Sequence, residues 1–496
     1  MSNLSELLPA GGSAKEFEAV ASGTLPNGQA VILNSNGTVT SAGLVSVTES
    51  IPSGSASVFH TASVTFTAVA YDLSTVNRFV LIYQDGVTNY GTAVVGTVSG
   101  TSISFGTAIV FNSATTNYMD IAFAPNTGGK FVILYGNTGN SGAGTAIVGK
   151  ISGTSINFGN PTVFNSGFTA LFGISFDPNT TNRFIITYFD GGNSNYGTAL
   201  SGNLYSTAHI SWGSEVVFNA ATTINAEVQF DPNTANKFVV AYKDNGNNYY
   251  GTTRVGTLSG STISFSGSEH VFSSGAVGEY ISLSFDPNTA NKFVVASVAG
   301  SGTVVGQAIV GTVSGSSISY GSNSVFNAAT VSYISLRFNP NTANQFVIVY
   351  DDNTNSQYGT AIVGTVSGTS ISYGSEYVFN SAATIQTKID FDPDTIGKFV
   401  IAYYNGGNTD GEARIGQLAA PSLTNLTSTN LLGTSTAAFT NGQTATIVPK
   451  GGVSTNQSSL TIGSTYYVQV NGTVSTVSTS PAVILGKAVS STSLIL

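Results

Sequence analysis

The 496-residue sequence contains no cysteine, so disulfide bonds and thiolate metal sites are excluded. Charge is also scarce, because Asp, Glu, Lys and Arg make up only 8% of the residues. With a formal net charge of −9, the chain has no basic stripe to displace counterions from phosphates, which argues against nucleic acid as a partner. No apolar run approaches the ~20 residues of a membrane-spanning helix, so we expect no membrane insertion.

The first residues of the sequence do not have the pattern of a secretion signal. Residues 1–9 have neither the positive segment nor the apolar segment of a signal peptide, so we expect synthesis in a cytoplasm without a cleaved signal. Gly, Ser, Thr and Asn take the place of the missing charged residues, and 41% of the chain is hydrophobic. This composition favours strands joined by tight turns over helices.

An internal repeat dominates the sequence, and two phenylalanine positions mark it. One opens runs such as Phe-Val-Val-Ala-Tyr at 238–242, with spacings of 52 to 55 residues: Phe79, Phe131, Phe184, Phe238, Phe293, Phe346 and Phe399. The other follows a valine and has the same period: Phe59, Phe111, Phe164, Phe218, Phe272, Phe326 and Phe379. The two series lie at different positions within the repeat, and the second begins 20 residues before the first.

Each repeat predicts four strands, illustrated by residues 280–285, 238–242, 360–366 and 371–379. The first alternates apolar and polar residues, whereas the second is apolar on both faces, as expected for a strand in mid-sheet. A turn of the type Asp-Pro-Asn-Thr-Ala-Asn-Lys separates them. Four antiparallel strands in about 50 residues is typical of one blade of a β-propeller.

The ends of the repeat region complement each other. Residues 51–59 match a fourth strand, such as 318–326, with no unit before them, and the seventh unit stops after its third strand at 412–418. We therefore predict an all-β, seven-bladed β-propeller over residues 48–420, in which the N-terminal strand 51–59 completes the last blade. An open solenoid is the alternative, but it leaves the divided unit unexplained.

The two flanks lie outside the repeat. Residues 1–47 contain two predicted strands with Asn-Gly turn signals, and residues 421–496 contain similar runs at 466–474 and 482–489. We expect an N-terminal β-rich attachment segment that packs with the C-terminal β-rich segment in one small module.

Both flanks carry a resemblance. Residues 17–39, 460–468 and 486–492 resemble segments of virion structural proteins of tailed bacteriophages, especially the tail-fibre and appendage proteins of marine phages. The resemblance implies a virion location and other virion proteins as partners through the terminal segments. It also implies attachment to a host-surface glycan or receptor, or decoration of the particle. No heptad repeat or fibre shaft is present, so oligomerisation is left open.

The acidic residue before each turn is the first candidate for chemistry: Asp72, Ala124, Asp177, Asp231, Asp286, Asn339 and Asp392. Because one position is Ala and another is Asn, we predict that this residue caps the turn and does not bind cations. A basic residue recurs six positions later in all but one repeat. We expect it to pair with the acid across the hairpin, in an exposed interaction of ~0–1 kcal/mol.

Catalytic and metal sites find no support in the sequence. His60, His209 and His270 occur at different offsets in different repeats, so they are not expected to converge on a metal or a base. Glu227 and Glu279 are the main carboxylates predicted near the channel mouth, with no arginine trio beside them. We therefore predict a non-enzymatic protein without a cofactor. The alternative is a carbohydrate-binding lectin or a glycoside-active enzyme of the β-propeller type.

The loops between the second and third strands are the predicted binding surface, since they are rich in Asn, Gly and Tyr. Tyrosine rings beside amides suit the faces and hydroxyls of sugars, or a protein partner. The alternative is that each Tyr packs over its neighbouring Gly and closes the hairpin. The candidate ligand-binding residues are Asn89, Tyr90, Asn195, Tyr196, Asn248, Tyr249, Tyr250 and Tyr358.

Overall fold

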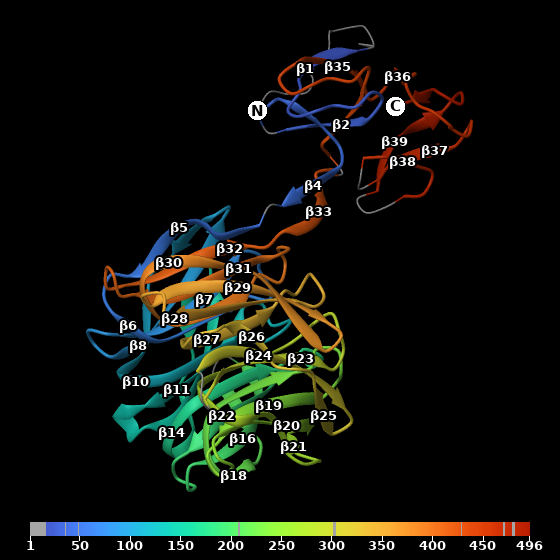
Figure 1. Cartoon of the computed structure of the whole chain (residues 1–496). Helices are drawn as coiled ribbons and strands as arrows, with labels where there is room; N and C mark the ends of the chain where they lie inside the picture. The colour runs from blue at the N-terminus through green and yellow to red at the C-terminus, as the bar shows by residue number, and fades with distance from the viewer. Residues whose placement is uncertain are drawn as a thin grey trace. The chain divides into compact units, whose positions relative to one another are not determined.

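The computed structural model of the chain describes residues 16–34, 36–47, 49–206, 209–300, 304–427, 429–469, 472–478 and 482–496. These form two compact units, one of Ser50–Leu418 and one of Met1–Glu49 with Ala419–Leu496 (Figure 1). The absence of a signal peptide was predicted from residues 1–9, which lie outside the described residues. Within the described ranges, no helix has the length and apolar character needed to cross a membrane.

The unit Ser50–Leu418 consists of repeated antiparallel sheets. In the first complete repeat, β6, β7, β8 and β9 pair in chain order. The strands of this unit are β5 (Ser50–His60), β6 (Val64–Tyr71), β7 (Arg78–Asp85), β8 (Tyr90–Ser99), β9 (Ser102–Phe105), β10 (Ile109–Phe123), β11 (Lys130–Asn137), β12 (Ala143–Ser152), β13 (Ser155–Phe158), β14 (Thr162–Phe176), β15 (Arg183–Asp190), β16 (Tyr196–Ser206), β17 (His209–Trp212), β18 (Val216–Phe230), β19 (Lys237–Asp244), β20 (Tyr250–Ser259), β21 (Thr262–Ser264), β22 (His270–Phe285), β23 (Lys292–Ala299), β24 (Val305–Ser314), β25 (Ser317–Tyr320), β26 (Ser324–Asn327), β27 (Val331–Phe338), β28 (Gln345–Asp352), β29 (Tyr358–Ser367), β30 (Ser370–Phe391), β31 (Lys398–Asn405) and β32 (Asp410–Gln417), with a short 3-10 helix at Thr138–Asn140.

Several strands are longer than the sequence predicts, because the fourth strand of one repeat continues into the first strand of the next. The first half of β10 pairs with β8, and its second half pairs with β11. Just after the change of partner, the register of the β10–β11 pair shifts between Asn117 and Asp120, and Tyr118 adopts a φ of 49°. Such a β-bulge bends a strand without ending it, so one strand can serve two sheets. β14, β18, β22 and β30 do the same.

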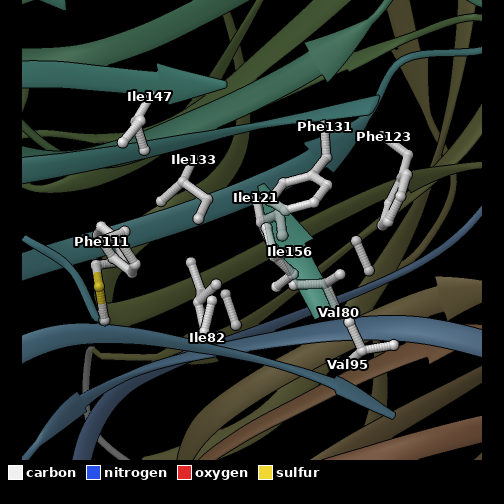
Figure 2. Close-up of a cluster of buried hydrophobic side chains, with 14 of the residues drawn as sticks. Val80, Ile82, Val95, Phe111, Ile121, Phe123, Phe131, Ile133, Ile147 and Ile156 are labelled. Carbon is white, nitrogen blue, oxygen red and sulfur yellow. The ribbon is translucent and has the colours of Figure 1, made fainter. Parts of the chain in front are cut away.

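Hydrophobic cores fill the space between successive sheets. Figure 2 shows side chains of β7 and β8 pointing toward those of β10 and β11. Val80 and Ile82 on one sheet and Phe131 and Ile133 on the next are fully buried. The second strand of each repeat is apolar on both faces because a neighbouring sheet covers each face.

The predicted pairing of residues 51–59 with 412–418 is confirmed. β5 is antiparallel to β32, with Ser57 opposite Ala413 and Ser53 opposite Ile415 (Figure 1). The last repeat is also bonded to the first, since the Tyr71 amide donates to Asp390 at 2.7 Å. The row of sheets therefore closes on itself.

The acidic turn residues cap their turns, as predicted. The prediction that a basic residue pairs with each acid in an exposed interaction was wrong. The Asp286 carboxylate accepts the amide of Asn288 at 2.9 Å, and Asp72, Asp177, Asp231 and Asp392 cap their turns in the same way. Among the described residues, only Arg78 and Arg183 form ion pairs with their turn acids, and Asp72 and Asp177 have no exposed side-chain surface. These pairs are therefore buried at the acid, which contradicts the exposed interaction expected from the sequence.

Where the basic residue is lysine, the acid bonds to the next repeat. The second oxygen of Asp286 accepts the amide of Asn344 at 2.9 Å, and that of Asp231 accepts the amide of Asn291 at 2.9 Å. Asp392 accepts the amide of Asn77 at 3.2 Å, which again joins the last repeat to the first. An arginine guanidinium reaches the acid of its own turn. In the repeats with lysine, a backbone amide of the following turn bonds to that acid instead.

The second unit combines strands from both flanks. β2 pairs with β34, and β1 pairs with β35, so residues more than 400 positions apart share one sheet. Ala30, Leu431 and Leu485 belong to its buried core. Its strands are β1 (Phe17–Val20), β2 (Ala30–Leu33), β3 (Val39–Ser41), β4 (Leu44–Val47), β33 (Ala420–Thr424), β34 (Leu431–Ser435), β35 (Thr444–Pro449), β36 (Val453–Ser454), β37 (Thr465–Val468), β38 (Val474–Ser475), β39 (Val483–Ala488) and β40 (Leu494–Ile495).

Candidate functional site

The tyrosines predicted to bind a ligand begin the third strand of their repeats. Tyr90, Tyr196, Tyr250 and Tyr358 are the first residues of β8, β16, β20 and β29. All four are half-buried, and within the described chain their hydroxyls form no hydrogen bond and their rings no ring contact. Their hydroxyls thus keep their hydrogen-bonding capacity.

The residue before each tyrosine has a backbone role. The carbonyls of Asn89 and Asn195 each accept an amide of the following repeat at 3.1 Å, from Thr116 and Thr223. The φ angles of Asn89, Asn195, Asn248 and Tyr249 lie between 52° and 63°. Asparagine tolerates this left-handed conformation better than most residues, which accounts for its recurrence here.

The glycine after each tyrosine is covered by a phenylalanine. At Gly91, a Cβ atom would lie 2.6 Å from the ring of Phe111, and Gly197, Gly251 and Gly359 meet the same obstacle from Phe218, Phe272 and Phe379. The glycine therefore makes room for the second repeat phenylalanine. The eight predicted residues lie on four separate loops, and no described hydrogen bond or ring contact joins one loop to another.

The first strands of the repeats, here called the inner strands, and the turns that follow them line an axial cavity. Every repeat contributes to its walls, from Val69 and Ile121 through Ile174 and Gln229 to Phe391, and its empty volume is about 1100 Å³. Each inner strand is the edge of its sheet, so its outward amides need partners from elsewhere. Side chains of the preceding repeat supply them, at 3.0 to 3.3 Å: Ser175 to Phe230, Ser282 to Leu336, Ser284 to Phe338 and Ser335 to Ile389.

Charged residues on the inner strands converge on this axis. Asp120 accepts the amide of Ile174 at 3.1 Å, and its other oxygen accepts the amide of Ile121 at 2.9 Å. Burial, reinforced by the negative charge of Glu227, raises the pKa of Asp120 to about 6, although Lys388 opposes the shift. Burial likewise raises the pKa of Asp390 to about 6, against the opposing charge of Arg337, whose Nε lies 3.8 Å from an Asp390 oxygen.

Sequence reasoning located Glu227 and Glu279 near the axis but missed Asp120, Arg337, Lys388 and Asp390. All four lie two or four residues beyond the bulge of an inner strand. When the repeats are aligned at that bulge, these four charged residues fall on two positions of the inner strand. The other residues at these two positions are small or polar.

One end of the axis carries a smaller pocket, the mouth pocket, lined by Phe172, Asn225, Ala226, Glu227, Glu279, Tyr280, Ile281, Ile334 and Lys388. Its empty volume is about 440 Å³. Within the described residues, the side chains of Asn225, Glu227, Glu279 and Lys388 form no hydrogen bond or ion pair. Tyr280 stands beside them, with its ring 4.8 Å from the ring of Tyr333. An amide, two carboxylates and an ammonium group therefore face open space next to aromatic surfaces.

Asp120 and Glu227 together resemble an acid and base pair, because the Asp120 carboxyl has a raised pKa and a second carboxyl, that of Glu227, near it. Both oxygens of Asp120, however, are already bonded to backbone amides. Asp120 also does not line the mouth pocket. These contacts indicate a structural role for Asp120, which links β10 to β14.

The Asp120→Asn variant tests that assignment through pH. A carboxyl whose pKa rises on folding keeps its proton in the folded state, while the unfolded chain releases its proton above about pH 4. The wild type therefore loses stability as the pH rises from about 4 to about 6, by up to about 2 kcal/mol from this residue. We expect the unfolding temperature of Asp120→Asn to fall less over this range, since Asn keeps an oxygen for the Ile174 amide. Parallel curves for the two proteins would contradict the assignment.

The three histidines lie on different strands: His60 on β5, His209 on β17 and His270 on β22. His60 has its Nε2 3.6 Å from Asp85, and the ring of His209 lies 6.0 Å from that of Tyr205. In the part of the chain that the structure describes, no group of three or more His, Asp or Glu residues is arranged to hold a metal.

A solved structure shares this architecture. A lectin of Burkholderia pseudomallei, BP39L, matches with a TM-score of 0.50 and 12% identity, over 73% of this chain and 99% of the lectin. The fold is a β-propeller. The Aleuria aurantia lectin, in complex with α-methyl-L-fucoside, matches with a TM-score of 0.41 and 10% identity, over 65% of this propeller chain and 99% of its own. Sqt1 of Chaetomium thermophilum matches with a TM-score of 0.45 and 12% identity, over 70% and 83%.

The likeness to BP39L extends to the fold alone at this level of identity. No protein-family model matches the propeller chain, and no curated protein matches it either.

Proposed function

We propose that the chain is a non-enzymatic carbohydrate-binding protein, with a seven-bladed β-propeller that binds its ligand at the mouth pocket. The observation that carries the proposal is the set of unpartnered polar groups beside aromatic rings in that pocket. Sugars offer hydroxyls for Asn225, Glu227 and Lys388 and apolar ring faces for Phe172 and Tyr280. The propeller fold shared with a lectin supports the same conclusion.

The blade count rests on the repeat and on the closing strand. Seven phenylalanine anchors occur in each of two series, and β5 supplies the strand that the last unit lacks. A virion location, partners among other virion proteins and oligomerisation remain predictions from the resemblance of the flanks. Binding of a surface glycan is compatible with them.

The proposal is tested by probing a glycan array with the full chain and measuring the affinity of each retained sugar. Glu227→Gln and Tyr280→Ala should each weaken binding by about 10-fold or more, since a charge-assisted hydrogen bond contributes ~1.5–3 kcal/mol. Glu18→Gln, an exposed carboxylate on β1, is the matched control and should bind normally. Tyr358→Ala tests the loop surface separately.

Three results would count against this function. Failure to retain any glycan would overturn it, and unchanged affinity in both mouth variants would move the site elsewhere. New reducing ends released from a bound polysaccharide, and lost in Glu279→Gln, would show an enzyme instead. Unfolding curves must show that each variant is folded.

A further inference from the structure

One repeat departs from the others on the outer side of its sheet. The residue after the last buried position of the third strand is serine in five repeats, at Ser99, Ser152, Ser259, Ser314 and Ser367, but it is Tyr205 here. The sequence of this repeat is also one residue longer here, with five residues between Leu204 and Ile210 where Val98 and Ile103 enclose four. Because the repeated residues build the common scaffold, a local departure from them points to a task of this repeat alone.

A second departure lies opposite the first. The aromatic position paired with the scaffold glycine is Phe or Tyr in five of the other repeats, as in Gly96 with Phe105 and Gly311 with Tyr320. Here Gly202 pairs with Trp212, the only tryptophan of the chain. The Trp212 ring rests on the core at Phe164 and Phe184, with centroids 5.5 and 5.6 Å away.

Both aromatic residues line one groove, which we call the Tyr205–Trp212 groove. Its other lining residues are Thr180, Thr181, Arg183, Ser201, Gly202, Asn203, Ser211, Gly260 and Ser261, and its empty volume is about 850 Å³. Gly260 and Ser261 belong to the next repeat, and the hydroxyl of Ser201 donates to the Ser261 carbonyl at 2.7 Å. That hydrogen bond ties the two walls together, so the groove is preformed.

The polar groups of the groove retain hydrogen-bonding capacity. Tyr205 is 65% exposed. Among the described residues, its hydroxyl and the side chains of Asn203 and Ser211 have no hydrogen-bond partner. The indole nitrogen of Trp212 and the Nε of Arg183 are buried without a partner. Unpaired polar groups between aromatic rings suit a ligand with an apolar face and several hydroxyls.

The groove offers no net charge to such a ligand. Of the described residues that line the groove, Arg183 alone is charged, and it forms an ion pair with Asp177. The same guanidinium also donates to Thr180 at 3.0 Å and to Asn236. A neutralised arginine gives no preference for carboxylate or sulfate groups.

We propose that the Tyr205–Trp212 groove is a second carbohydrate site, which takes an uncharged sugar ring and works independently of the mouth pocket. The test uses Trp212 itself, because the fluorescence of a single tryptophan reports on this groove alone. The full chain is titrated with the methyl pyranosides of neutral hexoses and deoxyhexoses. The proposal expects at least one of them to produce a saturable change in tryptophan emission.

Variants taken from the other repeats sharpen the test. Tyr205→Ser restores the common residue at an exposed position and should raise the dissociation constant at least about 10-fold. Trp212→Phe removes the reporter but should abolish binding measured by calorimetry. Glu227→Gln in the mouth pocket should leave the fluorescence titration unchanged, which separates the two sites.

Two outcomes would overturn the proposal. One is the absence of any saturable emission change and calorimetric binding with neutral sugars, while glycan-array binding through the mouth pocket persists. The other is an equal response of wild type and Tyr205→Ser. Tighter binding of sialylated or sulfated sugars than of neutral ones would overturn the ligand class.

Discussion

A chain reduced to residues 62–418 should fail to fold cooperatively, whereas residues 50–418 alone should fold. The two chains differ by β5 and the residue after it, and β5 is the only partner of the free edge of β32 among the described residues. Ile51 and Phe59 of this strand are 6% and 8% exposed, and they belong to two different core clusters. Each contributes about 1.5–3 kcal/mol by burial, and the lost ladder of hydrogen bonds adds to this.

The expected loss is large relative to the net stability of a domain, which is about 5–15 kcal/mol. Removal of β5 also uncovers a strand edge that other chains can pair with, so aggregation should accompany the loss. Thermal unfolding followed by circular dichroism and size-exclusion chromatography measures both effects.

The control for this truncation is addition of the missing strand in trans. A peptide of residues 50–60 should restore the unfolding transition of the 62–418 chain, because the pairing needs no covalent link. Equal unfolding temperatures for the 62–418 and 50–418 chains would contradict a closing role for β5.

Gly364→Ala should destabilise the propeller by about 1–3 kcal/mol, even though it adds a single methyl group. A Cβ atom at Gly364 would lie 2.2 Å from the ring of Phe346, which is fully buried on the neighbouring strand. The ring cannot move away, because the sheet of the preceding repeat packs against it. Each repeat anchor phenylalanine of the second strand meets a glycine in this way, so the result should hold at Gly96, Gly149, Gly202, Gly256, Gly311 and Gly416.

Gly374→Ala in the same repeat is the matched control. A Cβ atom there would meet only the Val363 carbonyl oxygen, at 3.9 Å. Replacing Gly by Ala at an unstrained position reduces the freedom of the unfolded chain, so this variant should be unchanged or slightly more stable. Chemical unfolding of the two variants measures the difference, and equal midpoints would show that the Phe346 contact is unimportant.

The turn acids show how far local reasoning reaches. Turn capping by Asp286 and its equivalents was predicted correctly, because the carboxylate and the amide are two residues apart. The second partner of each acid was predicted wrongly at the lysine repeats, because it belongs to the next repeat, 58 residues away in the case of Asn344. Spacing within one hairpin carries no information about that contact.

The candidate sites, too, were predictable from the sequence only as far as local residues and the repeat determine them. Glu227 and Glu279 could be placed at the axis from the repeat pattern, but their free side chains and the neighbouring Lys388 became visible only in three dimensions. The predicted loop asparagines hold left-handed turns, and their carbonyls tie one repeat to the next. Tyr205 and Trp212 stand out against the other repeats, yet no sequence pattern shows that they share a groove with Gly260 of the following sheet.

The sequence by itself determined the all-β class, the four-stranded repeat and the strand that closes the last sheet. These follow from side-chain alternation, turn residues and a period, all of which are local properties of the chain. Only the tertiary structure decided which polar groups are satisfied and which face open space. That balance depends on the contacts of each inner strand and outer turn with the adjacent sheet, which lies more than 50 residues away along the chain.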